Sequence, residues 1–216
     1  MPQIYRLENY NPKLQTISLI VGEGLCSNIY VIGKVDATLI DTGVGNRSNP
    51  IFPQLSELGV KPENINQVIL THAHHDHAMG TFLILEKSNP KVYVHEKDTQ
   101  YIASSFGDAL VKVNEGDKIT TSIGELSVYW TPGHTKGSMC LYNKENKILF
   151  SGDTVFPNGY YGRYDGESGS LQAIIESLKK LTELDVEIML PGHGSPVLQD
   201  ANSHIELSHR QASRTR

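Results

Sequence analysis

Four histidines and one aspartate lie within seven consecutive positions, in the segment THAHHDH at residues 71–77. Imidazole is the commonest metal ligand in proteins, so a cluster this dense favours a cation site over a solvated loop. In an extended segment, side chains two positions apart point to the same side, which lets His72 and His74 reach one cation. The chain must then turn, and Asp76 and His77 can point at a second cation beside the first.

Three further candidates each follow an apolar run and stand beside glycine, proline or serine: His134 in TPGHTKGS, Asp153 in FSGDT and His193 in LPGHGS. Scaffolds commonly present functional side chains on turns at a sheet edge. In isolation, His134 or His193 is more often a hydrogen-bonded turn residue than a ligand. The cluster at 71–77 is what favours ligation here.

These segments together supply five histidines and two aspartates, enough for two cations that share one bridging carboxylate. Imidazole and carboxylate ligands without thiolate suit zinc, and also iron, manganese or cobalt. We therefore expect two divalent metal ions, with Zn²⁺ favoured and iron or manganese as alternatives.

The remaining histidines are expected to lie at the surface or around the metal ligands, and both cysteines are expected to have structural roles. The two cysteines are far apart and form no C-x-x-C pair, which argues against a disulfide framework or a thiolate zinc site. The residues in this group are His75, His95, His204, His209, Cys26 and Cys140.

Short strands and helices must position these residues. The pattern predicts strands over 14–22, 28–33, 37–43, 67–72, 91–95, 110–116, 118–124, 125–133, 138–143, 147–153 and 187–194. It predicts helices over 51–59, 78–88, 170–181 and about the last twenty residues. Strands followed by a helix occur twice over, which indicates two packed sheets with helices outside, an αββα sandwich. No linker interrupts the chain, so residues 1–216 are predicted to form a single domain.

Composition narrows the classes of function. The chain has 216 residues, 38% of them hydrophobic, and a formal net charge of −5 without a long basic run, so no nucleic-acid partner is expected. No apolar run approaches the roughly 20 residues of a membrane span, and the first residues lack a charged and then apolar leader. We expect a cytoplasmic protein, not associated with membranes, that acts on a small-molecule substrate. Its oligomeric state is left open, with a homodimer as one alternative.

The motifs THAHHDHAMG, TPGHTKGS, SGDTVF and PGHG, in this order, resemble the metallo-β-lactamase superfamily. The resemblance extends from IDTG at 40–43 to PGHG at 191–194 and implies a four-layer αββα fold, with two mixed sheets flanked by helices and metals in a groove at the sheet edges. It implies that one metal is held by His72, His74 and His134, and the other by Asp76, His77 and His193, with Asp153 bridging. Asp41 in IDTG looks like the carboxylate that orients a ligand imidazole in this family.

Within the superfamily, TPGHTKGSMCLY, GDTVF and GRYD at 162–165 look most like the glyoxalase II (hydroxyacylglutathione hydrolase) branch and the related persulfide dioxygenases. One major group of β-lactamases has cysteine where this chain has Asp153, so β-lactam hydrolysis is less favoured. Only 23 residues follow His193, so we expect the glutathione-binding helical region of glyoxalase II to be mostly absent.

The favoured function is hydrolysis of a thioester, ester or lactone by a hydroxide that bridges two metals. Asp76 is the expected catalytic residue, because it lies where it can hold the nucleophile and pass its proton to the leaving group. The main alternative is a persulfide dioxygenase with one iron ion. An RNA nuclease is less favoured at a net charge of −5. A purely structural site is disfavoured because structural zinc is usually closed and four-coordinate.

The loop PNGYYGRYDGESG at 157–169 follows Asp153 and is expected to overhang the site. Tyr160, Tyr161 and Tyr164 are candidates to donate a hydrogen bond to a substrate carbonyl. Arg163 and Lys136 are candidates to meet an acidic substrate. The alternative for Arg163 is an ion pair with Asp165 that holds the loop.

Overall fold

Seven short strands form the first sheet in the computed structural model, which describes residues 3–215. Strands β1 to β4 pair antiparallel, and β4 to β7 pair parallel, in sequence order across the sheet. Both faces of this sheet are covered, and its inner strands β3 and β4 are buried along their whole lengths. The strands are β1 (Ile4–Arg6), β2 (Ile17–Ile20), β3 (Ile29–Ile32), β4 (Ala37–Ile40), β5 (Ile65–Ile69), β6 (Lys91–His95) and β7 (Leu110–Val113).

Five strands form the second sheet, in the order β12-β11-β10-β9-β8. Strand β12 runs parallel to β11, and the other pairs are antiparallel, so this sheet is also mixed. The strands are β8 (Lys118–Thr121), β9 (Gly124–Trp130), β10 (Met139–Asn143), β11 (Ile148–Gly152) and β12 (Ile188–Pro191).

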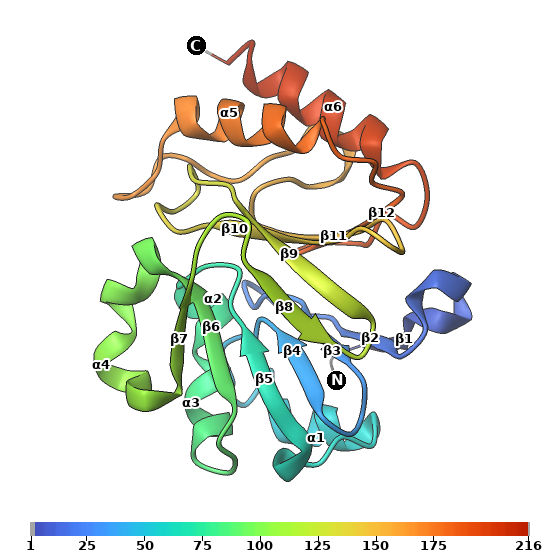
Figure 1. The fold of residues 1–216 in the computed structure, drawn as a ribbon, viewed down its shortest axis with the longest axis vertical. Helices are drawn as coiled ribbons and strands as arrows, with labels where there is room; N and C mark the ends of the chain where they lie inside the picture. Colours follow the sequence, from blue (N-terminus) through green and yellow to red (C-terminus); the bar gives the residue numbers. More distant parts are fainter. Residues whose placement is uncertain (1–2, 216) are drawn as a thin grey trace.

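Helices cover the outer faces of both sheets, so the layers run helix, sheet, sheet, helix (Figure 1). Helices α1 (Ile51–Glu57), α2 (His75–Ala78), α3 (Gly80–Leu85) and α4 (Ala103–Phe106) lie beside the first sheet, and α5 (Leu171–Leu181) and α6 (Ala201–Ala212) lie above the second. The predicted αββα sandwich is confirmed. Short 3-10 helices fill the connections: η1 (Leu7–Asn9), η2 (Pro12–Leu14), η3 (Pro62–Asn64), η4 (Glu96–Tyr101), η5 (Gly107–Ala109) and η6 (Pro157–Gly159).

Three buried apolar clusters correspond to the three spaces between the four layers. One cluster joins the two sheets and includes Leu19, Ile40 and Phe150. A second joins the first sheet to its helices, and a third joins the second sheet to α5 and α6. Within the described part of the chain, no helix is long and apolar enough to cross a membrane.

The strands that carry the predicted ligands all end at one side of the molecule. Strands β4 and β5 are parallel, and so are β11 and β12, so the carboxyl ends within each pair lie at the same edge of their sheet. Strand β9 is separated from β11 by one antiparallel neighbour and therefore runs in the same direction as β11. The connections after these strands carry His72, His134, Asp153 and His193.

One predicted helix has different bounds in the structure. The helix expected over 78–88 is divided into α2 and α3, and it ends at Leu85. The carbonyl oxygens of Asp76 and His77 accept hydrogen bonds from Ser27 N and Thr42 N, and Gly80 N donates to Gly43 O. These backbone groups thus form hydrogen bonds with other segments in place of the hydrogen bonds within a continuous helix. The strand β1 and the helix α4 were not predicted.

Candidate metal centre

His72, His74 and His134 form the first of two triads at the sheet edges. His72 Nε2 lies 3.1 Å from His74 Nδ1, and the His134 ring is 4.8 Å and 4.6 Å from the rings of His72 and His74, centroid to centroid. One nitrogen of each residue lies within 4.8 Å of those of the other two. Three imidazole nitrogens that converge in this way can hold one cation.

Asp76, His77 and His193 form the second triad. His77 Nε2 lies 3.2 Å from His193 Nε2, and His193 Nε2 lies 3.2 Å from Asp76 Oδ2. His77 is fully buried, whereas the other two side chains are about one-third exposed. This triad therefore combines a buried ligand with an opening to solvent.

Asp153 lies between the triads. Its Oδ1 is 3.4 Å from His77 Nε2, and its Oδ2 is 3.5 Å from both His134 Nε2 and His193 Nε2. One carboxylate thus approaches nitrogens of both triads, which is the position expected of a bridging ligand.

The donor atoms fit divalent metal ions. Nitrogens at about 2.0–2.1 Å from a tetrahedral cation lie roughly 3.3 Å apart, close to the separations found here. Among the described residues, the buried His134 Nε2 and Asp153 Oδ1 have no hydrogen-bond partner. Buried polar atoms without a partner are costly, and a cation would satisfy both. We conclude that the residues present suit two divalent ions.

Asp41 orients the buried histidine of the second triad. Its Oδ2 lies 2.8 Å from His77 Nδ1, and it accepts hydrogen bonds from Thr71 N and Thr71 Oγ1, each at 2.8 Å. An N–H on Nδ1 that donates to Asp41 leaves Nε2 with its lone pair directed at the centre. Asp41 is 2% exposed, so its carboxylate is held rigidly beneath the cluster.

A backbone carbonyl orients His134, and sequence reasoning did not identify it. His134 Nδ1 lies 2.8 Å from Arg163 O, which leaves Nε2 free to face Asp153. The sequence carries no signal for this contact, because any residue can supply a main-chain oxygen. The turn that bears His134 is also held by Trp130, whose Nε1 donates to Lys136 O at 2.9 Å and whose ring stacks on His95 at 5.4 Å.

Asp98, in η4, is a second residue that sequence reasoning missed. It is fully buried and accepts hydrogen bonds from Ala73 N at 3.0 Å and from Thr135 Oγ1 and Gly137 N at 2.8 Å each. A Cβ on Gly137 would lie 2.6 Å from the Asp98 carboxyl carbon, so only glycine lets this loop approach. Asp98 therefore joins the loop of His72 and His74 to the turn of His134.

A family model for the metallo-beta-lactamase superfamily matches residues 22–193, a range that includes both triads and Asp153. The chain belongs to the metallo-beta-lactamase superfamily.

Relatives within the superfamily include named hydrolases. A probable metallo-hydrolase of Methanocaldococcus jannaschii is 30% identical over 191 residues, which cover 80% of this chain and 90% of that protein. The acyl-coenzyme A thioesterase MBLAC2 of Homo sapiens is 28% identical over 212 residues, covering 77% of this chain and 72% of that protein. A solved structure of TTHA1623 in a di-iron-bound form has a TM-score of 0.69 and 26% identity, covering 89% of this chain and 96% of that chain. The superfamily fold is thus shared with these relatives, and one of the solved structures holds two iron ions.

Two buried histidines of this superfamily member have opposite pKa shifts. Burial, together with the nearby imidazoles of His77 and His134, holds the pKa of His72 well below 6.5. Burial alone would lower the pKa of His77, but Asp153 and Asp41 outweigh it and hold that pKa well above 6.5. Burial alone would raise the pKa of Asp153, but the charge and hydrogen bond of His77, together with the charges of His193 and His134, outweigh it and lower that pKa to about 2. A proton on His77 therefore balances the two carboxylates, and a cation bound there must displace it.

The three tyrosines predicted to contact the substrate lie in different surroundings. The Tyr161 hydroxyl lies 2.7 Å from Thr215 Oγ1, and the ring packs against the core under α5 and α6, so a contact of Tyr161 with substrate is not favoured and stays a prediction. Tyr164 stacks on Tyr161 and packs against the same core, so its predicted contact with substrate is not favoured. Tyr160 is 69% exposed, and its role stays a prediction.

The guanidinium of Arg163 forms two hydrogen bonds with Asp165, each 3.0 Å long, and points into solvent with 82% of the side chain exposed. The loop-holding ion pair weighed for Arg163 is therefore present, and its contact with an acidic substrate stays a prediction. Lys136 is exposed beside the His134 turn, where its role in binding stays a prediction.

The other histidines and the cysteines occupy varied positions. His75 is exposed, and His204 Nδ1 accepts a hydrogen bond from Asn158 N. His95 is 2% exposed and lies against Trp130, so it is a buried residue and not a surface one. Both cysteines are free and buried, consistent with structural roles.

Proposed function

We propose that this protein is a metal-dependent thioester hydrolase with two divalent cations, Zn²⁺ being the favoured metal. The position of Asp153 within 3.5 Å of histidines from both triads is the observation that carries the proposal. A carboxylate shared by two triads favours a two-metal centre over the single iron of a dioxygenase. The relatives named as metallo-hydrolase and thioesterase support the same reaction class.

Cations bound here would lower the pKa of a bound water to about 7 and polarise the substrate carbonyl. Asp76 is the residue of this chain placed to handle the proton of that water. Its carboxylate is only partly buried, at 30% exposure, and Oδ2 lies 3.2 Å from His193 Nε2, at the open side of the centre. It accepts the proton as water adds to the carbonyl carbon, and returns it to the sulfur after the carbon–sulfur bond breaks.

Asp41 and the Arg163 carbonyl contribute by fixing imidazole orientation. Each accepts a hydrogen bond from the ring nitrogen that faces away from the centre. The other nitrogen of His77 and of His134 therefore directs its lone pair toward the centre. Catalysis at such a centre depends on this preorganisation, because donors that are already in place need no rearrangement during the reaction.

Thioesters are favoured over esters and lactones for two reasons. The glyoxalase II-like motifs and the acyl-coenzyme A thioesterase relative both indicate thioester substrates. A thiolate is also a good leaving group, since a free thiol has a pKa near 8.5, so proton return by Asp76 is not demanding.

The test combines metal analysis with a substrate panel. Protein purified without chelators from cells supplied with zinc, iron and manganese is expected to contain about two zinc ions per chain. Thioesters, esters and lactones with matched acyl groups are then compared before and after metal removal and reloading. Hydrolysis that favours thioesters and depends on reloading supports the proposal. One iron per chain with oxygen uptake on a persulfide would overturn it.

A further inference from the structure

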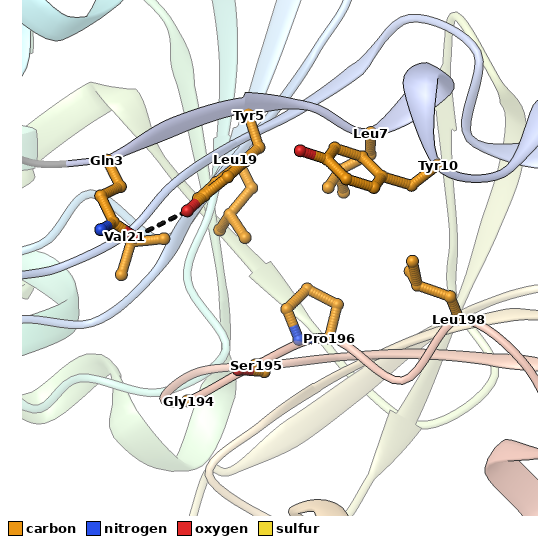
Figure 2. Close-up of a pocket in the computed structure, with 10 residues that line it drawn as sticks. All are labelled: Gln3, Tyr5, Leu7, Tyr10, Leu19, Val21, Gly194, Ser195, Pro196 and Leu198. Carbon is orange, nitrogen blue, oxygen red and sulfur yellow. Dashed lines mark hydrogen bonds between the residues drawn. The ribbon is translucent and has the colours of Figure 1, made fainter.

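An apolar groove lies at the edge of the two sheets, between the N-terminal strands and the segment after His193 (Figure 2). Its volume is about 330 Å³. The rings of Tyr5 and Tyr10 meet edge to face at 6.1 Å along one wall, and the 194–198 segment forms the opposite wall. The lining residues are Gln3, Tyr5, Leu7, Tyr10, Leu19, Val21, Gly194, Ser195, Pro196 and Leu198.

The lining selects an uncharged, apolar ligand. None of these residues carries a charge, and the Tyr5 hydroxyl is engaged with Gln3 Oε1 at 2.6 Å. Leu7, Leu19 and Leu198 continue into the core between the sheets, so the floor of the groove is hydrocarbon. The lining residues offer no cation to a phosphate or carboxylate, whereas burial of an alkyl chain among them lowers the free energy.

One end of each wall lies on the side of the molecule that carries the metal ligands, because β2, which precedes Val21, runs in the same direction as β4. Gly194 directly follows His193, and Asn28 Nδ2 donates to Gly194 O and Pro191 O, which fixes this turn. Val21 leads into the 22–28 connection, where Ser27 N donates to Asp76 O. His193 is directly followed by the lining residue Gly194, so an alkyl chain on a carbonyl at the centre would enter the groove past the second triad.

The other side of the centre has different chemistry. A cavity of about 240 Å³ adjoins His74 of the first triad, and polar or charged residues including His75, Asp98 and Glu167 line it. The apolar groove thus lies on the side of the second triad, and the polar cavity lies on the side of the first. A thioester has the same division, with an alkyl chain on the carbonyl and a polar thiol component on the sulfur.

We propose that the apolar groove binds the acyl chain of the substrate, so that the enzyme acts on medium-chain acyl thioesters. This inference rests on the proposed function. The groove volume of about 330 Å³ is roughly ten times the 30 Å³ share of one water molecule, which suits an alkyl chain of about eight carbons. That volume lies at the low end of small-molecule sites.

The test measures kcat/KM for acetyl, butanoyl and octanoyl thioesters of one thiol. Wild type is expected to favour octanoyl over acetyl by at least about thirtyfold, because each buried methylene adds to binding. Val21→Trp fills the groove and should reduce this ratio to about threefold or less. Val35→Trp makes the same change at a position that is 70% exposed and does not line the groove, and should retain the ratio.

A second variant and a binding measurement guard against misfolding. Tyr10 is 58% exposed, so Tyr10→Glu should be tolerated by the fold while placing a charge in the groove. It is expected to lower the octanoyl to acetyl ratio as Val21→Trp does. Binding of 1-octanol, followed by calorimetry, should weaken at least about tenfold in both variants and be unchanged in Val35→Trp.

The outcomes separate the two proposals. An unchanged ratio and unchanged octanol binding in Val21→Trp and Tyr10→Glu would overturn the groove assignment while leaving thioester hydrolysis intact. Failure to hydrolyse any thioester would overturn the proposed function, and octanol binding would then decide whether the groove takes an alkyl chain. A stable dimer that Tyr10→Glu dissociates would show that a second copy covers the groove, and would also overturn the assignment.

Discussion

The two halves of the molecule supply their metal-ligating side chains in different ways. The first half provides His72, His74, Asp76 and His77 from one continuous segment between β5 and α3. The second half provides one side chain from each of three turns, after β9, β11 and β12. A continuous segment keeps its ligands close through local geometry, whereas separate turns are brought together only by the packed sheet. The second half should therefore be more sensitive to changes that disturb packing.

The largest effect is expected for Asp153→Ala, because this carboxylate belongs to both triads. Metal content should fall below two ions per chain, and activity should fall more than about a hundredfold. Elemental analysis and thioester hydrolysis measure the two effects. Asp165→Ala, at an exposed carboxylate of the neighbouring loop, serves as the control and should retain metal. A variant of Asp153 that keeps both ions would contradict the bridging assignment.

A large effect is also expected where the halves are joined. Asp98→Ala leaves the donors Ala73 N and Gly137 N without their acceptor, whereas Thr135 Oγ1 keeps the Ser138 hydroxyl as a partner. The free energy of unfolding should fall by about 3–5 kcal/mol, since each buried unsatisfied donor costs about 1–3 kcal/mol. Denaturant titration of the metal-free protein measures the loss. Asp108→Ala, at an exposed position, should be neutral, and equal stability of the two variants would argue against the joining role.

A pH dependence should distinguish metal-free from metal-loaded protein. The raised pKa of His77 stabilises the metal-free fold fully below pH 6.5, and this stabilisation is lost as pH rises through the raised folded-state pKa. Metal binding displaces the same proton, so it strengthens with pH, by up to about tenfold per unit for one proton. The melting temperatures of the two forms should therefore diverge from pH 6 to pH 9. Proton release on loading, measured in weak buffer, should accompany the divergence, and its absence would exclude a protonated His77.

The smallest effect is expected for Arg163→Ala. The guanidinium is exposed and pairs with Asp165, while the group that orients His134 is the main-chain oxygen, which the substitution retains. Thioester hydrolysis should change by less than about twofold, because exposed ion pairs contribute little. A large loss of kcat/KM would instead indicate that Arg163 contacts the substrate.

The same contrast explains what could be predicted from sequence. The ligand spacing in THAHHDH follows from the two-residue period of an extended segment, so the cluster is visible locally. The fully buried strands β10, β11 and β12 appear as short apolar runs, and the layers follow from their alternation with helices.

Other features depend on contacts between distant segments. Asp98 lies 35 or more residues from Thr135 and Gly137, its partners in the second half, and the carbonyl of Arg163 has no sequence signature at all. Tyr161 had the right residue type beside Asp153, yet packing against α5 and α6 directs its hydroxyl to Thr215. The division of the helix after His74 arises in the same way, from hydrogen bonds with residues 27 and 42–43.

The hydrogen bond from Trp130 to Lys136 O gives the protein an internal optical reporter. The chain has a single tryptophan, so its intrinsic emission comes from one indole. That indole donates a hydrogen bond to the turn that carries His134 and stacks on His95, whereas among the described residues the ring contacts of the second triad are with other histidines. Emission should consequently follow occupancy of the first triad and be nearly silent to the second, which allows stepwise loading of the two positions to be resolved without a dye or a label.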